Sequence, residues 1–136
     1  MKSAMFCLFF IASVGWIEYS DAADAARAPE CTEYIESGQW VYKFNEWVLE
    51  LKPTLCGRQI GPDETAYMFY EIAKKFSGDQ YWVNTRGIIN QLTCHLQIAR
   101  TKAEWNLEPW RPYVGHAETV LAGCNVVTPK PQPPFE

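Results

Sequence analysis

Residues 79–105 read DQYWVNTRGIINQLTCHLQIARTKAEW, and the expected fold is built around this stretch. At helical spacing it carries two apolar faces, one with Trp82 and Leu92 and the other with Cys94 and Ile98. A helix with one apolar stripe lies on a surface, whereas a helix with two apolar faces must be covered on both sides. We therefore expect a central helix here, packed between other parts of the chain.

Three further helices are expected around the central one. Apolar residues recur at helical spacing in residues 30–52, 62–77 and 112–124, and prolines or glycines stand near the ends of these ranges. Strand signals are poor, because no alternation of period two is sustained and no Asn-Gly turn occurs. The sequence therefore predicts an all-α fold, a compact bundle of about four helices stapled by two disulfides.

The first residues have the layout of a secretory signal. Lys2 precedes the apolar run 4–14, and small residues follow it. The run is too short to cross a bilayer as a helix. We expect a signal peptide over residues 1–22, cut after Ala22 or, as second choice, after Ala25. The mature protein is then expected to be secreted and extracellular, without stable membrane insertion.

The rest of the chain is expected to form one domain and a tail. Residues 23–125 suit a single helical, disulfide-stapled domain, because 136 residues are enough for one domain and not for two. Residues 126–136 hold four prolines and are expected to form an extended, flexible tail. The formal net charge is −4 and no basic block occurs, so no nucleic-acid partner is indicated. We expect a monomer.

Four cysteines remain after the expected cleavage, namely Cys31, Cys56, Cys94 and Cys124. An even number of cysteines in a short secreted chain implies disulfides, and close C-x-x-C pairs typical of metal sites are absent. In an up–down bundle, residues at like heights pair as Cys31 with Cys124 and Cys56 with Cys94. A sharp break in the first helix at Gly38 would reopen the other pairings.

No motif for catalysis or for a cofactor is found in the sequence. Cys94 and His95 are adjacent, but a nucleophilic pair needs a free thiolate, which a disulfide removes. Glu46, Glu50 and Glu71 fall at helical positions that are typical of solvated carboxylates. No G-x-S-x-G, H-E-x-x-H or P-loop sequence occurs. We therefore expect no enzymatic activity, no cofactor and no metal.

Aromatic residues are more numerous than a narrow four-helix core needs. They fill a bulky core, line an internal cavity for a small apolar ligand, or form an exposed patch that docks a protein. Tyr42 and Leu49 are expected on the outer side of the first helix. The candidate ligand- or partner-binding residues are Trp40, Trp47, Tyr70, Trp82, Trp105, Trp110, Tyr42 and Leu49.

The helical, doubly bridged design resembles insect odorant-binding proteins with a reduced cysteine set. The 37 residues between Cys56 and Cys94 suit that pattern, whereas the 24 before Cys56 and the 29 after Cys94 do not, so no function is carried over. We expect a secreted, non-enzymatic effector that binds another extracellular protein, in the manner of a hormone, pheromone, toxin or defence factor. The alternative is an extracellular carrier of a small apolar ligand in an aromatic-lined cavity.

Overall fold

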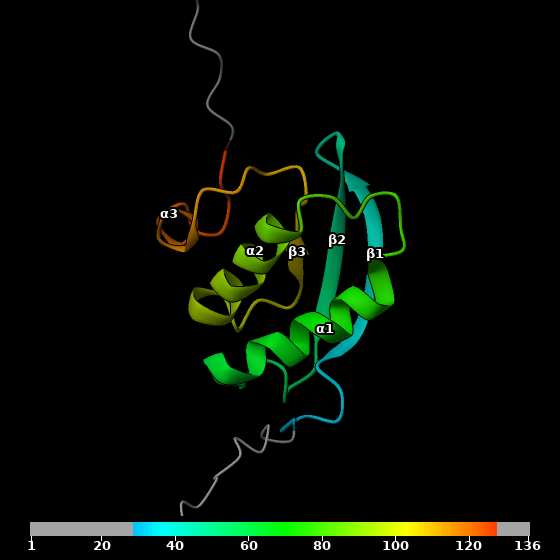
Figure 1. Ribbon diagram of the computed structural model, residues 1–136, viewed down its shortest axis with the longest axis vertical. Helices are drawn as coiled ribbons and strands as arrows, with labels where there is room; N and C mark the ends of the chain where they lie inside the picture. Colours follow the sequence, from blue (N-terminus) through cyan, green and yellow to red (C-terminus); the bar gives the residue numbers. More distant parts are fainter. Residues whose placement is uncertain (1–28, 128–136) are drawn as a thin grey trace, which may run out of the picture.

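The computed structural model describes residues 29–127, which fold into a three-stranded antiparallel sheet and three α-helices (Figure 1). The elements in chain order are β1 Ile35–Lys43, β2 Glu46–Pro53, the 3-10 helix η1 Pro62–Glu64, α1 Thr65–Phe76, α2 Thr85–Ile98, β3 Trp105–Leu107 and α3 His116–Leu121. The fold is mixed α and β, so the prediction of an all-α bundle is wrong. The domain expected over residues 23–125 is likewise not purely helical, because it contains the sheet.

A β-hairpin occupies the region where the sequence predicts a helix over residues 30–52. Its two turn residues, Phe44 and Asn45, have φ of 60° and 63°. Positive φ at both central residues is what a type I′ hairpin turn requires, and Asn-Gly is only its commonest sequence. Neighbouring residues Trp40 and Val41 are both apolar, so the two faces of β1 do not alternate clearly. The same residues therefore fit a helical stripe as well as a strand.

The register of the sheet places its large apolar side chains on one face. Trp40 lies opposite Leu49, which lies opposite Leu107, and Tyr42 lies opposite Trp47. Residues directly opposite each other in an antiparallel sheet point to the same side. One face of the sheet is therefore apolar over most of its length.

Helices α1 and α2 cover this apolar face, and α3 lies beside α2 (Figure 1). A single cluster of buried residues joins the sheet to the two helices, and the largest of its side chains is Trp105, which has no exposed surface. The cluster consists of Cys31, Tyr34, Ile35, Leu49, Leu51, Ile60, Met68, Ile72, Ile88, Leu92, Leu96, Trp105 and Leu107. At Gly38 of β1 an added Cβ would lie 2.6 Å from Cζ of Phe76, so this glycine lets the end of α1 approach the sheet.

The other three expected helices are present in shortened form. Residues 62–76 are helical, one residue short of the predicted range 62–77, because η1 and α1 follow each other directly. The central helix begins only at Thr85, since Asn84 has φ 51° and accepts a hydrogen bond from the Gly87 amide through its side chain. The last helix occupies only the middle of the predicted range 112–124.

Two disulfides form among the four cysteines, as predicted, but the predicted pairing is wrong. Cys31 is bonded to Cys56 and Cys94 to Cys124, with Cα atoms 5.8 Å and 5.7 Å apart. The predicted pairing assumed that one long helix separates Cys31 from Cys56. The hairpin reverses the chain direction instead, and it returns Cys56 to the level of Cys31.

The signal peptide predicted over residues 1–22 lies outside the described residues, as does all but the start of the tail predicted over residues 126–136. Within residues 29–127, no helix is both long enough and apolar enough to cross a bilayer.

Candidate functional site

The hairpin and the loop between α1 and α2 together carry a group of partly or largely exposed apolar side chains that we call the aromatic tip. It consists of Tyr42, Phe44, Trp47, Tyr81 and Val83. The ring centroids of Trp47 and Tyr81 are 4.0 Å apart with planes inclined by 17°, so the two rings stack. The Tyr42 ring lies 5.4 Å from the Trp47 ring in a tilted arrangement. The aromatic tip is therefore a connected set of rings at its centre.

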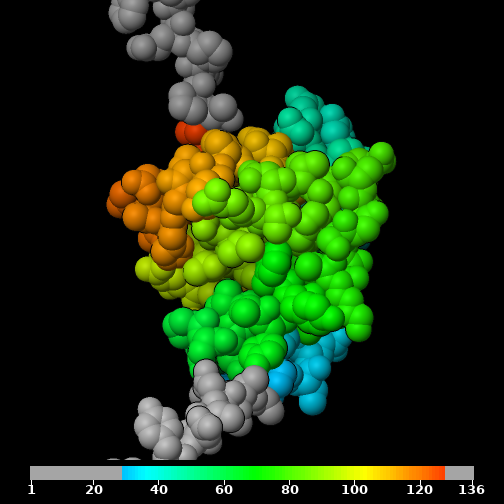
Figure 2. Space-filling model, viewed as in Figure 1, coloured from blue at the N-terminus to red at the C-terminus, as the bar shows by residue number. Residues whose placement is uncertain are grey.

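Two elements bring the aromatic tip together. Tyr42 and Trp47 flank the turn as opposite residues of β1 and β2, so their side chains share a face. The loop between α1 and α2 supplies Tyr81, and the Asp79 carboxylate accepts a hydrogen bond of 3.1 Å from the Tyr81 amide. Figure 2 shows the hairpin turn, in teal, projecting at one end of the molecule next to this loop, in light green.

Exposure and backbone geometry distinguish the aromatic tip from ordinary surface. The exposed fractions of Tyr42, Phe44 and Val83 are 58%, 73% and 53%. Single exposed apolar residues are normal, but a contiguous group typically marks an interaction site. Phe44 also has a left-handed backbone, which costs a large side chain about 1 kcal/mol or more. The chain thus holds a phenylalanine in water at a position that asparagine or glycine would occupy with less strain.

A hollow of about 210 Å³, which we call the tip hollow, lies beside the aromatic tip. It is lined by Glu46, Trp47, Gln80, Tyr81, Val83, Pro109 and Trp110. The hollow thus combines aromatic and apolar walls with the polar side chains of Glu46 and Gln80. This combination suits the binding of an apolar group that also needs orientation by hydrogen bonds.

Asn84 links the parts of the chain that form the tip hollow. Besides capping α2, its side-chain amide donates hydrogen bonds to the carbonyls of Pro109, at 3.3 Å, and Arg111, at 2.6 Å. The Arg111 guanidinium lies 4.5 Å from the centroid of the Trp110 ring. Asn84 therefore ties the segment that carries Trp110 to the loop that carries Tyr81 and Val83.

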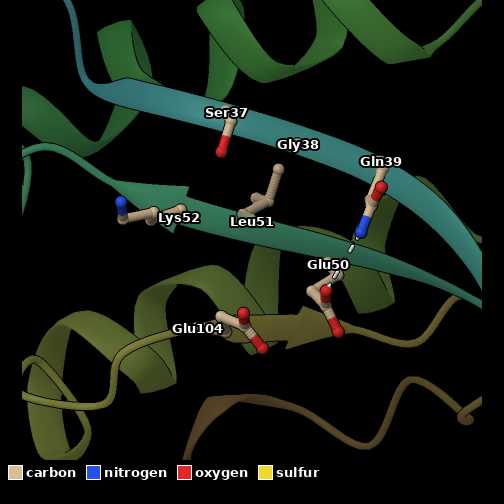
Figure 3. Close-up of a pocket in the computed structure, with 7 residues that line it drawn as sticks. All are labelled: Ser37, Gly38, Gln39, Glu50, Leu51, Lys52 and Glu104. Atoms are coloured by element: carbon tan, nitrogen blue, oxygen red, sulfur yellow. Dashed lines mark hydrogen bonds between the residues drawn. The ribbon is translucent and has the colours of Figure 1, made fainter.

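A second depression, of about 180 Å³, lies at the polar face of the sheet and is lined by Ser37, Gly38, Gln39, Glu50, Leu51, Lys52 and Glu104 (Figure 3). Glu50 accepts hydrogen bonds from Lys43 Nζ at 2.6 Å and from Gln39 Nε2 at 3.3 Å. The hydrogen bond from Lys43 holds the pKa of Glu50 below its ordinary value. Lys43 also donates a hydrogen bond to the Asn106 side chain at 2.9 Å, so the hydrogen bonds of these polar groups connect all three strands.

A third depression, of about 410 Å³, lies between the start of α1, α2 and α3, and is lined by Gly61, Pro62, Thr65, Thr93, Leu96, Gln97, Arg100 and His116. His116 Nε2 is 2.7 Å from the Gln97 side-chain oxygen. The Arg100 guanidinium donates hydrogen bonds to the carbonyls of Arg58 and Ile60, each at 2.8 Å. None of the aromatic residues predicted to bind a ligand lines this groove.

The residues considered for catalysis occupy structural positions. Cys94 is bonded to Cys124 and is not a free thiolate. His95 is buried, its Nδ1 lies 2.8 Å from the Gln91 carbonyl, and burial lowers its pKa. Burial alone would raise the pKa of Glu71, but hydrogen bonds from two backbone amides and from Lys75 lower it. Among residues 29–127, no three His, Cys, Asp or Glu side chains gather as a metal-ligand set.

The structure brings three of the predicted binding residues to the tip region. Tyr42 and Trp47 belong to the aromatic tip, and Trp110 lines the tip hollow. Trp40 is half-buried against the core, with its ring 5.7 Å from that of Tyr81. These residues come from two strands and a distant segment, so their proximity depends on the sheet.

The other predicted binding residues lie elsewhere. Leu49, expected on an outer surface, is fully buried, as is Trp105. Trp82 is half-buried, packs against Phe69 at 6.1 Å and donates a hydrogen bond to Thr85. Tyr70 is exposed on α1 and is not part of the aromatic tip. Leu49 is misplaced because adjacent strand residues alternate between faces, whereas the sequence interpretation used helical spacing.

Sequence reasoning missed Phe44, Tyr81 and Val83. Phe44 falls within the helix expected over residues 30–52, and its hairpin role follows from Asn45, since asparagine tolerates left-handed geometry at a turn. Tyr81 and Val83 were placed inside the central helix. The signal for a loop there is Asn84, which suits a helix cap and precedes the first turn of α2.

Comparison with known proteins gives a family without an assigned activity. The family model described as "Protein of unknown function (DUF2599)" matches residues 35–127. Uncharacterized proteins of Mycobacterium bovis and Mycobacterium tuberculosis are 43% identical to the chain over 51 residues, which cover 35% of this chain and 34% of each relative. The match thus spans about a third of the length of these curated relatives. No solved structure matches the chain. The family match includes the hairpin, the Cys94–Cys124 disulfide and the residues that line the tip hollow. It covers more than half of the chain, and the chain therefore belongs to the DUF2599 family of proteins of unknown function.

Proposed function

We propose that the protein is a secreted, non-enzymatic effector that binds another extracellular protein through the aromatic tip. The observation that carries this proposal is the exposed cluster around the stacked rings of Trp47 and Tyr81. Tryptophan and tyrosine dominate binding hot spots, because they bury a large area at a small cost in conformational entropy. Burying a side chain such as Phe44 against a partner stabilises a complex by about 2 kcal/mol.

The arrangement of the tip supports docking rather than enclosure of a ligand. The tip projects at one end of the molecule (Figure 2), where a large partner can reach it. The strain at Phe44 supports the same interpretation, since a strained and exposed residue is typically retained at a functional site. The two disulfides suit an extracellular location, because disulfides persist in oxidising compartments.

The alternative is a carrier of a small apolar ligand, and the groove of about 410 Å³ between the helices favours it. Its volume is within the range of pockets that hold small ligands. The aromatic residues that would line a carrier cavity are instead in the core, in the tip region or, in the case of Tyr70, exposed on α1. Titration of the tryptophan fluorescence with a panel of apolar compounds distinguishes the two functions. Saturable quenching by one class of compound would favour the carrier.

The proposal is tested by capture of extracellular proteins on the immobilised full-length protein. Three forms are compared: the wild type, the double variant Tyr42→Ala/Phe44→Ala, and the double variant Leu55→Ala/Leu121→Ala. Leu55 and Leu121 are matched controls, because they are exposed apolar residues outside the aromatic tip. We expect a partner that the wild type and the control variant retain and the tip variant loses. If the tip variant retains every captured protein, the aromatic tip is not the binding surface.

A further inference from the structure

The tip hollow combines aromatic walls with a negative charge. Its lining includes the rings of Trp47, Tyr81 and Trp110 together with Glu46, and none of its described lining residues is a lysine or an arginine. The face of an aromatic ring attracts a cation placed over it. We propose that the tip hollow receives one positively charged side chain, lysine or arginine, of the extracellular protein partner. This inference rests on the proposed function and deepens it, because it names the chemistry that the partner must present.

The Glu46 carboxylate is not neutralised by a cation of the described chain. Lys43, which lies opposite Glu46 in the sheet, forms its ion pair with Glu50 instead, at 2.6 Å, and also bonds to Asn106. Glu46 is exposed, and its side chain takes part in none of the ion pairs within residues 29–127. Groups that meet across an interface are arranged with opposite charges. The charge of Glu46 therefore selects a positive group.

Arg111 contacts a wall of the tip hollow, but its charge is balanced. Its guanidinium lies 4.5 Å from the ring centroid of Trp110 and forms an ion pair with Glu108. The Glu108 carboxylate is buried, so this pair stays together at the edge of the hollow. Arg111 therefore leaves the charge of Glu46 to a group of the partner.

The size of the tip hollow suits one side chain rather than a whole ligand. Its volume of about 210 Å³ is below the range of roughly 300 to 1,000 Å³ that is usual for small-molecule sites. A lysine or arginine side chain packs its apolar stem along aromatic walls while its charged end stays near a polar group. Tyr42 and Phe44 are exposed nearby and can pack against neighbouring parts of the partner. Arginine is also one of the residues that dominate binding hot spots.

The charges around the aromatic tip favour a protein over a lipid surface. Besides Glu46, Asp79 places a carboxylate next to Tyr81, whose amide donates a hydrogen bond of 3.1 Å to it. Membrane surfaces attract basic segments through their lipid phosphates, and the described lining of the tip hollow offers no basic side chain to them. A basic segment of a protein is thus the occupant, and a choline head group is an alternative that the test below separates from it.

Titration of the full-length protein with three matched tripeptides tests the site. The peptides are acetyl-Gly-X-Gly-amide, where X is lysine, arginine or norleucine, and norleucine keeps an apolar stem without a charge. Binding is followed by the NMR signals of the indole N–H groups of Trp47 and Trp110. We expect the lysine and arginine peptides to bind about fivefold more tightly than the norleucine peptide, as a cation on an aromatic face does. Equal affinities for the three peptides would overturn the proposal.

Variants assign the binding to the tip hollow. Glu46→Gln keeps the size of the side chain and removes its charge, so the lysine peptide should bind about threefold more weakly and the norleucine peptide equally well. Glu104→Gln makes the same change at an exposed position outside the tip hollow, and it should alter neither affinity. An equal loss in both variants would assign the preference to net charge alone and overturn the proposal.

A third variant tests the aromatic wall. Trp110→Leu keeps an apolar side chain and removes the ring, so it should reduce the preference for lysine over norleucine. An unchanged preference in a folded Trp110→Leu protein would contradict the proposed contact with the ring. If Trp110→Leu does not fold, the comparison of Glu46→Gln with Glu104→Gln still tests the site, since both changes are at exposed positions.

Two further measurements separate the source of the cation and the proposed function. Phosphatidylcholine vesicles should not sediment the protein, and sedimentation that Glu46→Gln abolishes would assign the tip hollow to a choline head group instead. In the capture experiment, Glu46→Gln should retain less of the partner than Glu104→Gln. Selective binding of the basic peptides without capture of a partner would remove the proposed function and leave the cation site. Capture through the aromatic tip with equal affinities for the three peptides would remove this inference alone.

Discussion

The indole ring of Trp47 stacks on the phenol ring of Tyr81, with centroids 4.0 Å apart and planes inclined by 17°. Trp47 is in β2, and Tyr81 is in the loop between α1 and α2. The stack therefore joins the end of the hairpin to the helical layer at a place where the sheet extends beyond its cover. This contact orders the centre of the aromatic tip while leaving Tyr42 and Phe44 exposed.

The Trp47–Tyr81 stack is expected to stabilise the fold as a pair. Trp47→Ala, Tyr81→Ala and the double variant are compared by urea unfolding. Stacked aromatic pairs contribute about 1 kcal/mol beyond the area they bury, so the two single changes should sum to more than the double change by about that amount. Additive effects would show that the rings do not stabilise each other.

Phe44→Asn is expected to stabilise the protein and to weaken partner binding. Asparagine tolerates a left-handed backbone, so the free energy of unfolding should rise by about 1 kcal/mol. The same change removes the most exposed ring of the aromatic tip. Asn45→Gly is the control, since it alters the same turn and keeps Phe44. A loss of binding with Asn45→Gly as well would assign the effect to the turn and not to the phenylalanine.

The disulfides are expected to join Cys31 with Cys56 and Cys94 with Cys124, which mass spectrometry of non-reduced peptides determines. Replacing both Cys94 and Cys124 by alanine should lower the free energy of unfolding by about 3 to 4 kcal/mol, because the bridge closes a loop of 30 residues. Denaturant unfolding under oxidising conditions measures this difference. A peptide that joins Cys31 to Cys124 would contradict the hairpin.

His95 is expected to make stability depend on pH. Burial lowers its pKa in the folded state, so as the pH falls the unfolded chain takes up the proton first. The contribution of neutral His95 to the free energy of unfolding is complete well above the pKa of about 6.5 that histidine has in the unfolded chain. This contribution is lost as the pH falls through that value. Between pH 7.5 and 5.5 the loss is up to about 1.4 kcal/mol.

Urea unfolding at these two pH values measures the His95 effect. His95→Gln should show a smaller drop in the free energy of unfolding than the wild type. His116→Gln, whose side chain is exposed, should keep the drop of the wild type. An equal drop in His95→Gln and the wild type would mean that His95 does not carry the dependence.

The sequence predicts those parts of the fold whose signals are local. The helix over residues 62–77 has a proline at its start, one apolar stripe and a glycine after its end, and each of these features acts within a few residues. The four cysteines likewise predict two bridges. The hairpin is not predictable in this way, because Tyr42 and Trp47 meet through the pairing of strands and the turn between them lacks the usual Asn-Gly sequence. Strand β3 has three residues, too few to show an alternation.

The candidate site is harder to predict than the fold, since its residues come from separate segments. Residue type alone makes Tyr42 and Trp110 candidates, but their positions relative to each other depend on the sheet and on Asn84. Leu49 shows the opposite error, because an outward position on a helix becomes a core position on a strand. Because a hairpin replaces the helix predicted over residues 30–52, both the predicted disulfide pairing and the predicted exposure of Leu49 are wrong.

The central claim is that the aromatic tip is the surface that contacts a partner. Replacing Phe44 by p-benzoylphenylalanine in the full-length protein, followed by irradiation with extracellular proteins, tests this most directly. The same replacement at Leu121, which is 87% exposed on α3, is the matched control. We predict a discrete crosslinked product with another protein from position 44 and none from position 121. Absence of a product at position 44, or the same product from both positions, would contradict the claim.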